Sequence, residues 1–160
     1  MSVGTFATVT MPVDLTRCRG AAAIAYEVVE TYPGTRAVQL DEQTATIVFE
    51  LHFPGNLSGL VKRLRNNLIP VGDRAQISLP VRSLAPALIE GGPGVVAERL
   101  ESGTEVWDVQ FERGKYVFDA RVEGDRIAAA IVPSTSAMHQ IYDALLSLAL
   151  VADGPVLAAG

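Results

Sequence analysis

The sequence has little of the residue types that most often mark a catalytic or metal site. Its 160 residues include one cysteine, Cys18, and two histidines, His52 and His139. One thiol excludes a disulfide within the chain, and neither histidine belongs to a recognisable ligand spacing such as His-x-x-x-His. We therefore expect no resident metal and no cofactor.

Positive charge and long apolar runs are also scarce. Asp and Glu number 18 against 13 Lys and Arg, so the formal net charge is -5, which opposes general attraction to the phosphates of nucleic acid. No apolar run approaches the roughly 18 residues of a membrane-spanning helix, and residues 1–13 lack the pattern of a secretion signal. We expect a cytoplasmic protein with neither a nucleic-acid nor a membrane partner.

The first half of the chain has a clear amphipathic pattern. Residues 44–53 alternate with period two, which is typical of a strand with one buried face. Apolar stripes of helical period run through residues 21–32 and 57–68, the second after the capping residue Asn56, and shorter strand patterns cover residues 6–13, 36–40 and 75–81. This order predicts an α+β fold, a ferredoxin-like βαββαβ sandwich over residues 1–82 with both helices on one face of the sheet.

The second half has a different pattern. Residues 83–103 are rich in Gly and Pro and predict a connector with short helical pieces. Residues 104–160 predict a three-stranded antiparallel meander (105–112, 115–123 and 126–132) followed by a C-terminal helix. Arg113-Gly114 and Gly124-Asp125 are the expected two-residue turns.

The start of the first helix resembles a known family. The run Cys18, Arg19, Gly20, Ala21 followed by Pro33-Gly34 is similar to the heavy-metal-associated domain of copper chaperones, and the likeness covers roughly residues 5–80. Members hold the metal with two cysteines in a C-x-x-C loop. Here Cys18 aligns with the first ligand and Ala21 with the second, so the resemblance implies a degenerate member of the family.

The same loop suggests a reactive thiol. Arg17 and Arg19 flank Cys18 just before a helix, and both the positive charge and the helix N-terminus lower the pKa of a thiol. The alternative is that Cys18 is simply a small apolar residue.

The meander contains a conflict of charge. With a turn at Arg113-Gly114, Asp108 faces Asp119 across the ladder, and two opposed carboxylates need a cation or a shared proton. A neutralising Arg121 or a bulge that shifts the register are the alternatives.

Three more residues are candidates for a contact surface. Glu50 and His52 lie on the polar face of the strand over residues 44–53, and Trp107 either lines a cleft between the two halves or belongs to the core of the meander. The basic side of the second helix, Lys62, Arg63 and Arg65, either binds an acidic partner or is a solvated face.

These observations favour a binding or assembly protein without catalytic activity, whose ligand is an unknown small molecule or protein. We expect a homodimer, because the exposed edges of two small sheets need covering. Two alternatives stay open. One is a small enzyme or divalent-cation binder centred on Asp108 and Asp119, and the other is a degenerate metal chaperone.

Overall fold

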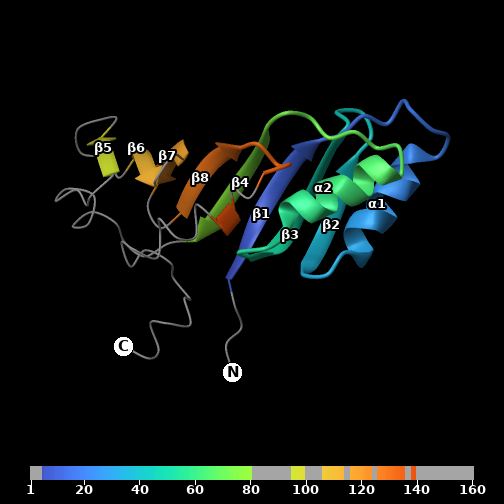
Figure 1. Ribbon diagram of the computed structural model, residues 1–160, viewed down its shortest axis with the longest axis horizontal. Coiled ribbons are helices and arrows are strands. Elements are labelled where there is room, and N and C mark those ends of the chain that lie inside the picture. The colour runs from blue at the N-terminus through green and yellow to red at the C-terminus, as the bar shows by residue number, and fades with distance from the viewer. Residues whose placement is uncertain are drawn as a thin grey trace, which may run out of the picture.

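The computed structural model describes residues 5–80, 95–99, 106–113, 116–123, 126–135 and 138–139 (Figure 1). Its strands and helices follow the chain in this order: β1 (Thr5–Pro12), α1 (Ala21–Thr31), β2 (Thr35–Asp41), β3 (Thr46–Phe53), α2 (Leu57–Asn66), β4 (Ala75–Pro80), β5 (Val95–Arg99), β6 (Val106–Arg113), β7 (Tyr116–Glu123) and β8 (Arg126–Ile131). The fold class is α+β, as the sequence predicts.

All of these strands belong to one antiparallel sheet with the order β2-β3-β1-β4-β8-β7-β6-β5. The first half contributes β2-β3-β1-β4, and both α1 and α2 lie on the same face of these strands (Figure 1). The segments between strands explain this placement. Each helix connects two parallel strands that have another strand between them, and such crossovers pack their helices on one side.

Backbone pairing joins the two halves of the chain. Strand β4 pairs with β8 from Ala75↔Ile131 to Pro80↔Arg126. The edge of β4, which the sequence pattern left open, is therefore covered by the chain itself, and its N–H and C=O groups are satisfied without a second molecule.

One part of the predicted connector is a strand. Residues 95–99 form β5, which pairs with β6 from Val95↔Phe111 to Arg99↔Trp107, so the prediction of short helical pieces is wrong for this segment. The physical reason is the run Val95-Val96, since β-branched residues favour strands when a neighbouring strand is there to pair with. The rest of the connector prediction, residues 83–94 and 100–103, lies outside the described residues.

The core lies between the helices and the sheet. The alternation predicted for β3 is confirmed, because Ile47, Phe49, Leu51 and Phe53 are all buried. The α2 stripe is confirmed through Leu64, but Leu68 is 59% exposed and Ile69 is buried in its place. Helix α2 ends at Asn66, and Leu68 takes a left-handed φ of 63° that turns the chain so that Ile69 enters the core.

The later strands extend this core. Ala120, Ile127, Ala129 and Ile131 are buried on the face of the sheet that carries the helices, as the meander pattern predicts. Of the predicted C-terminal helix the structure describes Met138, which is buried, and His139, and residues 140–160 lie outside the described residues. Within the described part of the chain, no helix is long and apolar enough to span a membrane.

Candidate functional site

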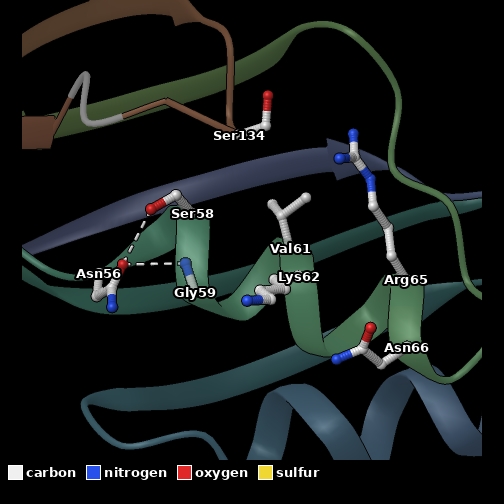
Figure 2. Close-up of a pocket in the computed structure, with 8 residues that line it drawn as sticks. All are labelled: Asn56, Ser58, Gly59, Val61, Lys62, Arg65, Asn66 and Ser134. Carbon is white, nitrogen blue, oxygen red and sulfur yellow. Dashed lines mark hydrogen bonds between the residues drawn. The ribbon is translucent and has the colours of Figure 1, made fainter.

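A polar groove runs along the outer side of α2. Its volume is about 440 Å³, and its far wall comes from the segment that follows β8 (Figure 2). Figure 2 shows Ser58, Val61 and Arg65 projecting from α2 toward that segment. The groove thus joins residues that the sequence pattern assigned to separate halves. Its lining residues are Asn56, Ser58, Gly59, Val61, Lys62, Arg65, Asn66 and Ser134.

Hydrogen bonds hold the N-terminal end of this groove. The side-chain oxygen of Asn56 accepts from the backbone N–H of Gly59 at 2.9 Å and from the hydroxyl of Ser58 at 3.0 Å, which confirms the predicted cap. The hydroxyl of Tyr32 donates to the carbonyl oxygen of Asn56 at 2.9 Å. Glycine is needed at position 59, because a Cβ there would lie 2.5 Å from the Tyr32 hydroxyl.

Two cationic side chains make the groove positive. Lys62 and Arg65 are exposed, and no ion pair or hydrogen bond engages either side chain among the described residues. Arg63, one position away, lies over the ring of Tyr32 at 5.0 Å and does not line the groove. Helix α2 contains no acidic residue, so a site of positive charge exists on a protein whose formal net charge is -5.

The predicted residues Glu50 and His52 meet two others on the open face of the sheet, by which we mean the face opposite α1 and α2. The guanidinium of Arg36 donates to the carboxylate of Glu50 at 2.6 Å and lies 3.6 Å from the centre of the Phe6 ring. The ring of His52 contacts Phe6 edge to face, with centroids 5.6 Å apart. The sequence pattern missed Phe6 and Arg36, because only the strand register places them beside β3.

The predicted pairing of Asp108 with Asp119 is wrong. In the β6–β7 ladder Asp108 lies opposite Arg121, and Asp119 lies opposite Gln110. Arg113, which the sequence predicts in the turn, pairs with Tyr116, and residues 114–115 lie outside the described residues. Each residue of β6 therefore has a partner two positions later on β7 than predicted, because a hairpin's register depends on where the chain turns. The register expected for the second hairpin is confirmed, because Glu123 pairs with Arg126, and residues 124–125 lie outside the described residues.

Cys18 lies in the loop before α1. It is half-buried, and its Sγ lies 3.9 Å from the carbonyl oxygen of Asn67. Arg17 forms a 3.1 Å ion pair with Asp14. Hydrogen bonds from Thr16, and then the bond from Arg17, lower the pKa of the Asp14 carboxyl. One of the two predicted cationic neighbours of the thiol therefore binds an acid, while Arg19 is exposed.

Ala21, which the family resemblance aligns with a second metal ligand, is the first residue of α1 and is 4% exposed in the core. Among the described residues no cluster of three or more His, Cys, Asp or Glu side chains could hold a metal ion. Trp107 lies in β6 opposite Arg99 and Val122.

Comparison with known proteins gives only remote likenesses. No protein-family model and no curated protein matches the chain. An aspartate kinase from Clostridium acetobutylicum has 7% sequence identity and a TM-score of 0.29, and the match covers 91% of this chain and 33% of that one. The ligand-free regulatory subunit of aspartate kinase from Thermus thermophilus has 15% identity and a TM-score of 0.26, with 89% of this chain and 97% of that one covered. Aspartokinase alpha and beta subunits have 11% identity and a TM-score of 0.28, with 92% of this chain and 98% of that one covered. This chain thus spans about a third of the clostridial enzyme. TM-scores this low carry no argument about fold or function.

Proposed function

We propose that this chain is a binding protein without catalytic activity, and that it holds a small anionic molecule in the groove along α2. The observation that carries the proposal is the pair of exposed cations, Lys62 and Arg65, which have no acidic partner among the described residues and line the same groove. Unpaired cations in a concave, polar site attract a ligand of opposite charge.

The spacing of the two cations indicates the size of the anion. Residues three positions apart on a helix are neighbours, with Cβ atoms about 5–6 Å apart, so Lys62 and Arg65 can reach one phosphate or two nearby carboxylates. The hydroxyl of Ser134 and the amide of Asn66 supply hydrogen bonds to further oxygens. Among the lining residues that the structure describes, Val61 is the one large apolar side chain and none is aromatic, which favours a polar metabolite over a nucleobase.

The chemistry of the lining supports binding rather than catalysis. The described residues of the lining include no His, Cys, Asp or Glu, so they supply no side chain that exchanges a proton easily near neutral pH. The alternative hypothesis of an enzyme depended on Asp108 lying opposite Asp119. The register places Asp108 opposite Arg121 instead, so that hypothesis has no such pair to support it.

We infer that residues 5–80 are a ferredoxin-like unit, supported by the strand order β2-β3-β1-β4 with both helices on one face. That scaffold carries many unrelated functions, so the argument for binding depends on the groove alone. A degenerate metal chaperone stays a second hypothesis with weaker support, since the aligned second ligand position is a buried alanine. The homodimer also stays a prediction.

The experiment is a calorimetric and NMR titration of the intact protein with inorganic phosphate and with citrate. We expect saturable binding, and Lys62→Gln and Arg65→Gln should each weaken it about tenfold or more, because each removes a charge-assisted hydrogen bond. Arg63→Gln is the matched control, since it removes the same charge from the same helix outside the groove. No binding of either anion, or an equal loss in all three variants, would contradict the proposal.

A further inference from the structure

A second hollow lies on the other side of the sheet, on the open face. Ser78, Ala128 and Arg121 are direct cross-strand partners on β4, β8 and β7, and Arg126 lies two positions from Ala128 along β8. Ile77 and Ile127, the neighbours of these residues along the strands, are buried on the helix side. The hollow has a volume of about 260 Å³, and its lining is Ser78, Arg121, Arg126, Ile127 and Ala128.

The hydrogen bonds in this hollow leave donors facing outward. Arg126 donates to the hydroxyl oxygen of Ser78 twice, from Nε at 3.2 Å and from Nη2 at 3.0 Å. These two bonds occupy both lone pairs of the oxygen, so the hydroxyl proton remains to be donated. The guanidinium keeps three further N–H groups. The hollow therefore presents donors and the positive charge of Arg126, while Arg121, which also lines it, lies opposite Asp108 in the β6–β7 ladder.

A small residue creates the space. Ala128 lies between Ser78 and Arg121 in the cross-strand row, and its methyl group leaves room that a longer side chain would fill. Ala130, two residues further along the same face of β8, is exposed too but does not line the hollow. Ala128 and Ala130 are therefore two exposed alanines on the same face of β8, and of these two only Ala128 lines the hollow.

We propose that this hollow binds a free small carboxylic acid, with its carboxylate bound by the fork of Arg126 and by the Ser78 hydroxyl. A guanidinium has the planar two-donor geometry that matches a carboxylate. The volume lies just below the range of about 300–1,000 Å³ for drug-sized ligands, which favours a small acid over a peptide. This site is independent of the α2 groove, because the two lie on opposite faces of the sheet.

The test is an NMR titration of the intact protein with succinate. We expect shifts of backbone amides in β4 and β8 that saturate, and a loss of affinity of about tenfold or more in Arg126→Gln. Arg126→Lys should lose nearly as much, because an ammonium keeps the charge but not the two parallel donors. If Arg126→Lys binds succinate with unchanged affinity, the carboxylate is not held by two parallel donors of Arg126. If the wild type shows no saturable shift, the hollow is not a binding site for a small carboxylic acid.

A filling variant tests the place of binding. Ala128→Leu should abolish the succinate shifts, whereas Ala130→Leu should keep them, and melting curves of both variants identify any loss of folding. Equal affinity in Ala128→Leu and wild type would contradict the proposal. Lys62→Gln separates this site from the α2 groove. It should weaken only the succinate shifts of amides in α2 and leave the saturation of the β4 and β8 shifts unchanged. Loss of the β4 and β8 shifts in Lys62→Gln would overturn the second site.

Discussion

The two faces of the sheet differ sharply although they are built from the same strands. On the covered face Val9, Phe49 and Ile77 are fully buried beneath the helices. On the open face their neighbours Thr8, Glu50 and Ser78 are partly exposed and carry hydroxyl or charged groups. The covered face provides the hydrophobic stabilisation, and the open face is free to present polar side chains to a ligand.

Helix α2 repeats this division on a smaller scale. Its inner side buries Leu57, Leu60 and Leu64, while its outer side presents Lys62 and Arg65 to the groove. Both proposed sites are therefore located on surfaces that turn away from the core. Substitutions there should change binding more than stability, and the following predictions test that separation.

The largest expected effect compares two adjacent residues of β4. Ile77→Ala should lower the free energy of unfolding by about 2–5 kcal/mol, because it leaves a cavity in a packed core. Ser78→Ala, on the open face, should cost about 1 kcal/mol or less, the usual contribution of one exposed hydrogen-bonding group. Urea unfolding measures both. Similar losses in the two variants would break the distinction between the faces.

The next effect concerns the cap of α2. Asn56→Ala should lower the free energy of unfolding by about 1 kcal/mol, because it removes the acceptor for the Gly59 N–H. Asn66→Ala, at the other end of the helix, is the control and should stay within about 0.5 kcal/mol of wild type. Thermal unfolding at a fixed pH measures both variants. A stable Asn56→Ala protein would show that the cap does not hold the groove's end.

A smaller effect is expected for the ion pair of the open face. A double-mutant cycle with Arg36→Ala and Glu50→Ala should give a coupling of about 0.2–1 kcal/mol, since both side chains are partly solvated. The coupling should decrease as salt is added, because salt screens exposed charges. A coupling of several kcal/mol would mean that the Arg36–Glu50 ion pair is shielded from water like the side chains of the covered face.

The smallest effect is a dependence on pH from Asp14. Its pKa is lower in the folded protein than the ordinary value of 3.8, so its carboxylate stabilises the fold above that value. The contribution is lost as the pH falls through the folded pKa. Asp14→Asn should therefore be slightly less stable than wild type at neutral pH, and urea midpoints of the two proteins should converge in acid. If the urea midpoints of the two proteins differ by the same amount at neutral and at acidic pH, the Asp14 carboxylate is not the source of the difference.

Local patterns predicted much of the fold correctly. The period-two run through β3, the stripe of α2 as far as Leu64 and the Asn56 cap depend on neighbours close in sequence, and the structure confirms each. The predictions that failed depend on distant partners. The register of β6 with β7 moved Asp108 away from Asp119, and β5 became a strand because β6 lies beside it.

The candidate sites follow the same rule. The polar position of Glu50 and His52 was predictable from alternation, but their contact with Arg36 and Phe6 was not. Lys62 and Arg65 were visible as a basic helix side, whereas Ser134 reaches the same groove only because β8 pairs with β4. The sequence offered no signal for the hollow at Ser78 and Arg126, since they lie 48 positions apart.

The amino-acid sequence by itself determined the helices and strands of residues 5–80, which side of α2 and β3 is apolar, and the acidic net charge, because these properties depend on side chains and their near neighbours. Tertiary structure alone decided the pairing of β4 with β8, which makes one sheet of two predicted halves. Strand pairing connects backbone groups that every residue carries, so its partners are chosen by the whole packed arrangement rather than by a local pattern.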